Sequence, residues 1–292
     1  MKNAIKYYYN LVPSDIHHKD DIYYFDTNHN HYLLFPFSGN TTYLNNIYNY
    51  LVNNRIMCLN IIPNKDNQMI TMINNIPYIL LISSITNRKI NIGDIINYTI
   101  IINSKHNNDW KSKWCEKLDY YEYQMQQFEK KYPIISESFT YYDGMTETAI
   151  SLLNNINPSV VNNYISHSRI GKNTSLQDLY NPLNMIVDTR VRDVSEYYKN
   201  LFFYEKNPLI EINQYLHNNH LTYEECMLFL ARMIYPSYYF DIYDDIISGK
   251  VSEQKINIIT SKVNEYEMFL KEIYSSINAM YNIPEIEWLK KT

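Results

Sequence analysis

ISHSRIGKNTSLQDLYNPLNMIVDTRVRDVSEYYK, residues 165–199, is the stretch that decides the fold. The tripeptide His167-Ser168-Arg169 begins a polar loop, and Asp188 follows 21 residues after His167, at the end of a short apolar run. Asp193, with Glu196 three residues later, fits a capping box that begins a helix. The stretch therefore predicts a polar loop, a short buried segment and a helix that bring these side chains close together.

This spacing is similar to that of the active site in aminoglycoside-kinase-like phosphotransferases. Such enzymes carry His-Gly-Asp at the tripeptide, and that Asp takes the proton from the acceptor hydroxyl. Arg169 stands in its place here, and a guanidinium is a donor only. The likeness also puts Asp188 at the position of a Mg²⁺-binding Asp. The second Mg²⁺ ligand of these enzymes is an Asn, whose position is Thr174 here, and Asn173 is the nearest candidate.

Glycine is scarce, with 5 residues in the whole chain. A loop that cradles phosphate needs glycines so that backbone N–H groups can approach the anion. Gly39 is the one glycine before Gly93, and neither of the common glycine-rich phosphate motifs occurs. The segment HYLLFPF, residues 31–37, has no Lys for phosphate pairing and is interrupted by Pro36. We therefore expect no glycine-rich loop that binds the phosphates of a nucleotide.

Two unequal lobes are predicted, a small one over residues 1–86 and a large helical one over residues 87–292. Two hairpins are expected in the small lobe, each with its turn between two apolar runs. Their strands are DIYYFDT (21–27) with HYLLFPF (31–37), and QMITMIN (68–74) with IPYILLISS (76–84). Between the hairpins, the stripe of residues 43–56 predicts a helix.

Helical spacing dominates the rest of the sequence. The clearest stripe predicts a helix that Pro133 ends, and its apolar residues are Trp110, Trp114, Leu118, Tyr121, Met125 and Phe128. A shorter helix is expected over residues 146–155, and Thr222 with Glu225 fits a second capping box. Apolar residues from Ile256 to Met280 predict one long C-terminal helix packed on the large lobe, in preference to a coiled coil.

Composition excludes several classes of function. The net charge is -5 and the basic residues form no cluster, so we expect no nucleic-acid partner. The longest apolar run, residues 76–82, is too short for a transmembrane segment, and the N-terminus lacks the pattern of a secretory signal. Three widely spaced cysteines suggest neither a metal site nor a disulfide scaffold. The 31 tyrosines fit a nucleotide bias, or exposed contact area in a dense assembly.

Two segments carry a resemblance to a known family: NMIVDTRVRDVSEYYKNLF (184–202) and FLARMIYPSYYFDIYDDI (229–246). They resemble the spore coat protein family of the CotS and YutH type, which shares the fold of aminoglycoside and choline kinases. The resemblance implies an α+β, two-lobe, protein-kinase-like fold. The YutH-like branch is similar in lacking the His-Gly-Asp base. The resemblance further implies that the partners are other spore coat proteins. It also implies a location first in the mother-cell cytoplasm and then in the spore coat.

Each singled-out residue also has a structural interpretation, which we favour. Asp188 is expected to pair with Arg169 or Arg190, so that it is at most a vestigial metal or nucleotide site together with Asn173. Asp193 is expected to cap its helix and to brace the loop at His167. The structural residues expected are Asp193, Arg192, Arg232 and Asp241, the last two in a buried aromatic and Arg–Asp packing element.

Three functions remain open at this point. The preferred one is a pseudokinase of the spore coat or of its assembly, which works through protein contacts and has no catalytic residue, metal or cofactor. The second is an atypical phosphotransferase that uses Mg-ATP, with Asp188 as metal ligand and Asp143 or Asp178 as base. The third is a nucleotide or small-molecule sensor.

Overall fold

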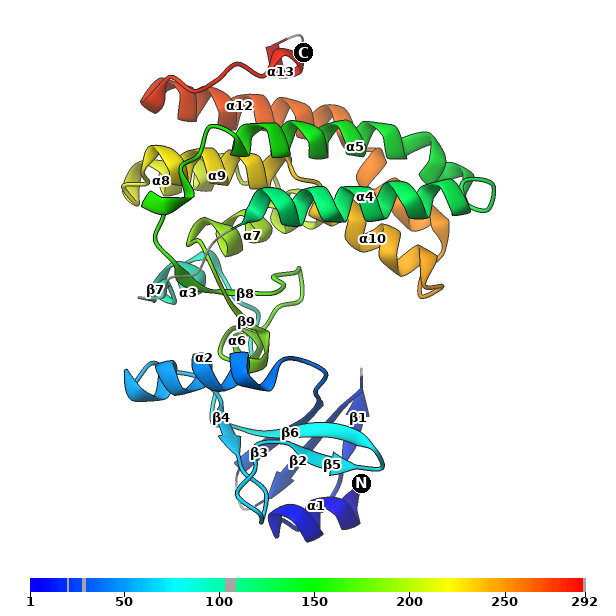
Figure 1. Cartoon of the computed structure of the whole chain (residues 1–292), viewed down its shortest axis with the longest axis vertical. Coiled ribbons are helices and arrows are strands. Elements are labelled where there is room, and N and C mark those ends of the chain that lie inside the picture. The colour runs from blue at the N-terminus through cyan, green and yellow to red at the C-terminus, as the bar shows by residue number, and fades with distance from the viewer. Residues whose placement is uncertain (20, 28–29, 103–108, 291–292) are drawn as a thin grey trace. The chain divides into compact units, whose positions relative to one another are not determined.

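The computed structural model describes residues 1–19, 21–27, 30–102 and 109–290. They form two compact units, shown in one view in Figure 1. The first contains residues 1–94 and 173–186, and the second contains residues 95–172 and 187–292. The segment 173–186, which the sequence analysis assigned to the large lobe, thus clusters with the sheet unit.

An antiparallel sheet is the centre of the first unit, in the order β1-β2-β3-β6-β4, with β5 paired to β6. Its strands are β1 (His17–Lys19), β2 (Ile22–Thr27), β3 (Asn30–Pro36), β4 (Asn60–Ile62), β5 (Thr71–Ile73) and β6 (Ile76–Ser83). Both predicted hairpins are confirmed. In the β5–β6 turn, Asn74 and Asn75 have φ of 51° and 63°, which is the left-handed backbone that a two-residue hairpin turn requires. Residues 28–29 of the β2–β3 turn lie outside the described residues.

One helix packs on each face of this sheet, because successive side chains of a strand point to opposite faces. Leu34 of β3 packs with Ile5 of α1 (Lys2–Tyr9), and Leu33 packs with Leu44 of α2 (Thr41–Asn53). Helix α2 begins after Asn40, whose side chain accepts a hydrogen bond from the Tyr43 N–H. It confirms the predicted helix between the hairpins.

The second unit is mostly helical. Its longer helices are α4 (Trp110–Phe128), α5 (Pro133–Leu153), α7 (Val191–Tyr204), α8 (Leu209–Asn218), α9 (Tyr223–Ile234), α10 (Ser237–Ile247) and α12 (Val263–Tyr281). Its short elements are η1 (Pro158–Val160), η3 (Glu253–Ile256), α11 (Asn257–Thr260) and α13 (Glu287–Lys290), whereas α6 (Leu176–Leu179) and η2 (Pro182–Asn184) belong to the first unit and α3 (Ile92–Asn97) spans the boundary between the units. Helix α9 is buried from Glu225 to Ile234 and packs against α5, α7 and α12 (Figure 1), and its two buried charged residues, Glu225 and Arg232, form ion pairs.

A small sheet in the order β7-β8-β9 positions the loop at His167. It consists of β7 (Ile100–Ile101), β8 (Tyr164–His167) and β9 (Met185–Asp188), and β7 pairs with β8 in antiparallel register. The end of β8 presents His167, and the end of β9 presents Asp188. Helix α7 begins three residues after Asp188, so the polar residues of the first quoted stretch gather at these ends.

Three details of the helical prediction were wrong. Helix α5 begins at Pro133, so the helix expected over residues 146–155 is only its last part; proline suits a first helical turn, where its missing N–H is not needed. Asp193 does not cap α7, whose N-cap residue is Arg190. The long C-terminal helix is interrupted before Val263, with Ile256 in η3 and Ile259 in α11. Apolar spacing in the sequence predicts which side chains are buried, but it does not show whether the helix between them is unbroken.

The second capping box is confirmed, because Thr222 and Glu225 exchange both of its hydrogen bonds at the start of α9. All three cysteines are free. Within the described ranges, no helix is both long enough and apolar enough to cross a membrane.

Candidate functional site

The loop at His167 is held from two sides by consecutive residues of α7. Asp193 accepts hydrogen bonds from the His167 backbone N–H (3.0 Å) and lies 2.6 Å from its Nδ1. Arg192 donates from Nε to the His167 carbonyl (2.9 Å) and from Nη2 to the Ser168 carbonyl (3.2 Å). Both carboxylate oxygens of Asp193 thus contact His167. Asp193 therefore braces this loop and does not cap the helix.

Asp188 is buried and fully engaged by hydrogen bonds. Its Oδ1 accepts from Arg232 Nη2 (2.6 Å), from Trp110 Nε1 (3.0 Å) and from the Thr189 N–H (2.7 Å). Its Oδ2 accepts from Arg192 Nη1 (2.9 Å). Burial opposes ionisation of this carboxyl, but Arg232 and Arg192 outweigh it and lower its pKa to about 2. The partners are thus Arg192 and Arg232, not Arg169 or Arg190 as the sequence suggested.

These contacts bear on the Mg²⁺ that a kinase-like fold implies. A metal at Asp188 would have to compete with two guanidinium groups for the same oxygens. Asn173, the other expected ligand, lies in the first unit, where it lines a separate pocket. Because guanidinium groups hold both of its oxygens, Asp188 does not fit a Mg²⁺ site in this structure.

Arg169 is exposed and forms an ion pair with Asp241 of α10, at 2.5 Å between Nη1 and Oδ1. Burial raises the pKa of Asp241 to about 6, with the Arg169 charge acting in the opposite direction. The tripeptide position therefore presents a cation already bound to a carboxylate. It offers no proton acceptor.

Arg190 is engaged elsewhere. Its guanidinium binds Glu225 with two hydrogen bonds, from Nε (2.6 Å) and from Nη2 (2.5 Å). Glu225 thus serves both the capping box of α9 and this ion pair.

A buried Lys lies at the centre of a second network, which the sequence analysis did not anticipate. Lys199 is fully buried and donates from Nζ to Glu196 Oε1 (2.8 Å) and to Ser237 Oγ (2.6 Å). The carbonyls of Arg232 (2.9 Å) and Tyr235 (3.2 Å) also lie within hydrogen-bond distance of Nζ, so its three N–H donors are shared among four acceptors. The one signal in the sequence was the spacing of Glu196 and Lys199, which places both on one helix face.

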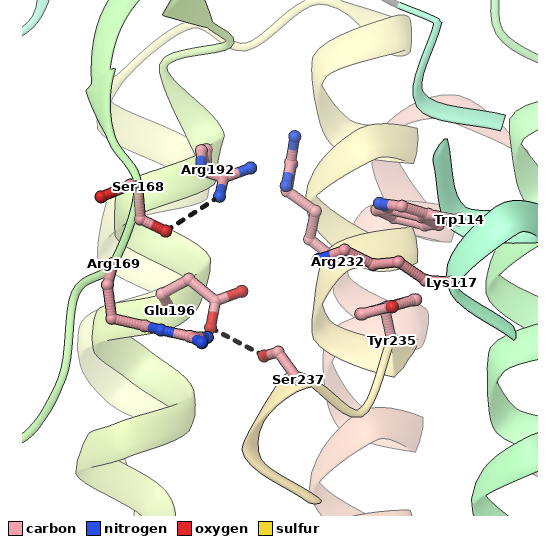
Figure 2. Close-up of a pocket in the computed structure, with 9 residues that line it drawn as sticks. All are labelled: Trp114, Lys117, Ser168, Arg169, Arg192, Glu196, Arg232, Tyr235 and Ser237. Carbon is pink, nitrogen blue, oxygen red and sulfur yellow. Dashed lines mark hydrogen bonds between the residues drawn. The ribbon is translucent and has the colours of Figure 1, made fainter. Parts of the chain in front are cut away.

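These two networks form the walls of a pocket with a volume of about 110 Å³ (Figure 2). It is lined by Trp114, Lys117, Ser168, Arg169, Arg192, Glu196, Arg232, Tyr235 and Ser237, all from the second unit. Figure 2 shows the side chains of Arg192, Glu196 and Arg169 facing those of Arg232, Lys117 and Ser237 across it. Expected site residues from the tripeptide, α7 and α9 are thereby brought together, and Lys117 is a lining residue that the sequence did not indicate.

The two acids considered as alternative bases lie apart from this lining. Asp178 forms a capping box with Ser175 at the start of α6, in the first unit. Asp143 lies on α5, where burial and then the charges of Glu122 and Glu147 raise its pKa to about 6.

A larger pocket, of about 340 Å³, belongs to the first unit alone. Its apolar lining comes from the sheet and the segment before β4, and its polar lining comes largely from residues 173–181. The residues are Lys19, Ile22, Tyr24, Leu33, Phe35, Leu59, Asn87, Asn173, Ser175, Gln177, Asp178 and Asn181.

Solved structures with a similar fold are phosphotransferases. An aminoglycoside phosphotransferase from Alicyclobacillus acidocaldarius subsp. acidocaldarius DSM 446 is 10% identical, with a TM-score of 0.66 and 96% of each chain covered. Spectinomycin phosphotransferase APH(9)-Ia, solved with ADP and spectinomycin, is 13% identical, with a TM-score of 0.60 and coverage of 94% of this chain and 97% of that one. Amicoumacin kinase hAmiN is 10% identical, with a TM-score of 0.52, and coverage is 99% and 95%. The predicted α+β, kinase-like fold is confirmed.

Sequence comparison identifies the family. No curated protein matches the chain in sequence. A family described as "Spore coat putative kinase YutH" matches residues 2–273, which is nearly the whole length and includes both segments that carried the resemblance. The chain therefore belongs to this spore coat family of kinase-like proteins.

Proposed function

We propose that the chain is a non-catalytic member of its family, which acts in the spore coat or in its assembly through contacts with other coat proteins. The observation that carries the proposal is the ion pair between Arg169 and Asp241, at the position where a kinase-like enzyme holds its base. A positioned general base contributes about 10²–10⁴-fold to a rate. The Arg169 guanidinium cannot supply that contribution.

The state of Asp188 supports the same proposal. Phosphoryl transfer depends almost entirely on positioning and on charge stabilisation by metal ions and cationic side chains. Here Asp188 is neutralised by Arg192 and Arg232. Strand β3 also has no Lys for phosphate pairing. Loss of the base, the metal ligand and the phosphate contact together weighs against turnover.

The chemical test is a phosphotransfer and ATP hydrolysis assay on the purified chain with Mg²⁺. We expect no turnover above background. Turnover that Asp188→Asn abolishes, with the fold intact by circular dichroism, would overturn the proposal. Asp143→Asn and Asp178→Asn then separate the two acids of the phosphotransferase alternative, since only the variant that removes the true base would lose activity.

The biological test is the position of a fluorescent fusion in a sporulating cell. We expect the fusion protein to be made in the mother-cell cytoplasm and then to collect at the rim of the spore. Tyr120 and Tyr123 are 52% and 64% exposed on α4 and offer an aromatic contact surface. A Tyr120→Ser/Tyr123→Ser variant should lose the rim signal, whereas Ile210→Ser, at another exposed apolar position, should keep it. A fusion that stays diffuse throughout sporulation would contradict a role through coat contacts.

The pocket of the first unit favours a second candidate, a nucleotide or small-molecule sensor without turnover. Tyr24, Leu33, Phe35 and Leu59 give it an apolar lining beside the polar groups of residues 173–181. Such a mixture is typical of ligand pockets. Titration with ATP, with and without Mg²⁺, tests this alternative, and micromolar binding in the absence of turnover would favour it.

A further inference from the structure

The pocket of the second unit is unusual in the charges that line it. Lys117, Arg169, Arg192 and Arg232 are four cations, and Glu196 is the single carboxylate among the lining residues. The acids behind the wall do not reverse this balance, because Asp188 is shared by two arginines, while Asp241 and Glu196 are each paired with one cation. Asp193 and Asp244 add negative charge behind the wall, but among the side chains that line the pocket the cations outnumber the carboxylates by four to one.

Asp244 lies near this cluster but does not belong to the lining. It is exposed, and its Oδ2 accepts a hydrogen bond from the Tyr121 hydroxyl (3.0 Å). Its charge acts on Arg169 and Lys117 from that side. Asp244 therefore offsets part of the charge of these two cations from outside the pocket, and the lining itself keeps four cations and one carboxylate.

Two of the cations have donors with no partner among the described residues. Arg232 is 4% exposed, and its Nε has no hydrogen-bond partner there. Lys117 forms no hydrogen bond or ion pair with any residue that the structure describes. Its pKa is lowered, first by the loss of water around the ammonium and then by the nearby charges of Arg192 and Arg169. Lys117 is exposed, so water can hydrate its ammonium, whereas Arg232 Nε is a buried donor, and a buried donor without a partner is costly.

The size of the pocket limits the ligand. Its volume is about 110 Å³, against about 340 Å³ for the pocket of the first unit. This small volume suits a compact group such as one tetrahedral oxyanion. Trp114 and Tyr235, with ring centroids 4.5 Å apart, form a rigid wall on one side.

We propose that this pocket binds a doubly charged, phosphate-sized oxyanion, such as the phosphoryl group of a phosphomonoester. Planar guanidinium groups match phosphate oxygens with paired hydrogen bonds, and Lys adds a point charge. The four cations of the lining suit the negative charge that such a group carries near neutral pH. This proposal does not depend on the proposed coat function, because anion binding and coat association are tested by separate experiments.

The test is calorimetric titration of the full chain with inorganic phosphate, in a buffer free of other oxyanions. We expect saturable binding and a rise in Tm relative to chloride at equal ionic strength. Sulfate, a second tetrahedral dianion, should compete, whereas acetate should not. A sugar phosphate and a phosphoserine peptide then distinguish the source of the group, because only a ligand whose attached part fits outside the pocket will bind more tightly than phosphate.

Variants place the binding in this pocket. Lys117→Gln and Arg169→Gln change exposed residues, so the fold should survive, and each should weaken phosphate binding by about tenfold or more. Lys113→Gln removes an exposed Lys from the same helix, outside the lining, and should leave the affinity unchanged. Absence of phosphate binding, or binding that is equally strong in all three variants, would overturn the proposal.

Discussion

Asp188 and Asp143 lie in the same helical unit, and their surroundings change their acidity in opposite directions. At Asp188, two arginines and the Trp110 ring N–H hold the carboxylate and lower its pKa to about 2. At Asp143, burial and the neighbouring charges of Glu122 and Glu147 raise the pKa to about 6. The buried Oδ1 of Asp143 has no hydrogen-bond partner among the described residues. The more buried of the two acids, Asp188, has the lower pKa, so the direction of the shift follows the charged partners more than burial.

The two acids differ in what their charge does for the fold. The ion network around Asp188 joins β9, α7 and α9, so its charges hold elements that are distant in sequence. At Asp143, between α4 and α5, the neighbouring charges are those of Glu122 and Glu147, and no ion pair of Asp143 joins distant elements among the described residues. Variants in the two regions should therefore have opposite effects on stability.

The largest effect is expected at Arg232. Arg232→Met removes one of the two guanidinium partners of a buried carboxylate, and loss of one member of a buried ion pair typically costs about 3–5 kcal/mol. Because Arg192 and Trp110 remain, we expect the free energy of unfolding to fall by about 3 kcal/mol in urea denaturation.

Arg169→Gln is the matched control, since it breaks an exposed ion pair and should cost less than about 1 kcal/mol. Equal losses in the two variants would show that the network at Asp188 adds nothing beyond a surface pair.

A smaller net effect is expected when both partners of the Glu196–Lys199 pair are replaced. Lys199→Met alone leaves Glu196 without its ammonium and should cost about 3 kcal/mol. Adding Glu196→Leu should recover part of that loss, because apolar replacement of both members of a buried pair is often close to neutral. A double-mutant cycle by urea denaturation measures this coupling, and strictly additive losses would contradict a specific pair.

Much of the fold follows from local patterns in the sequence. The Asn74-Asn75 turn, the capping box of Thr222 and Glu225, and the stripe of α4 each depend on residues close together in the chain. Turn chemistry, capping and helical periodicity act over a few residues, so each could be predicted without knowledge of the tertiary structure.

The candidate site could be predicted only in part. The sequence indicated that residues 167–169, Asp188 and Arg232 matter, but not which charges meet. Asp188 pairs with Arg192 and Arg232, although Arg190 is closer in sequence, because α7 turns Arg190 toward Glu225 at the start of α9. Lys117 and Lys199 enter the site from helix faces whose neighbours are set by tertiary packing alone. Ion pairs between distant elements leave no periodic signal.

The smallest effect, and the one with opposite sign, is expected at Asp143. Its raised pKa means that the folded state holds a proton more tightly than the unfolded chain, whose Asp titrates near 3.8. The associated stability is present in full below pH 3.8 and is lost as the pH rises through about 6. Asp143→Asn keeps the neutral form at every pH, so it should stabilise the protein at pH 7 by at most about 1 kcal/mol, after allowance for solvent screening, and by nothing near pH 4.

Tm measured from pH 4 to pH 8 checks this sign, with Asp119→Asn on α4 as a control for the loss of an exposed surface charge. Asp188 must behave in the opposite way, because its lowered pKa contributes stability above pH 3.8 that is lost only as the pH falls toward about 2. If Asp143→Asn destabilises the protein at pH 7, its carboxylate has a partner in the folded chain. The contrast between the paired and unpaired acids would then not hold.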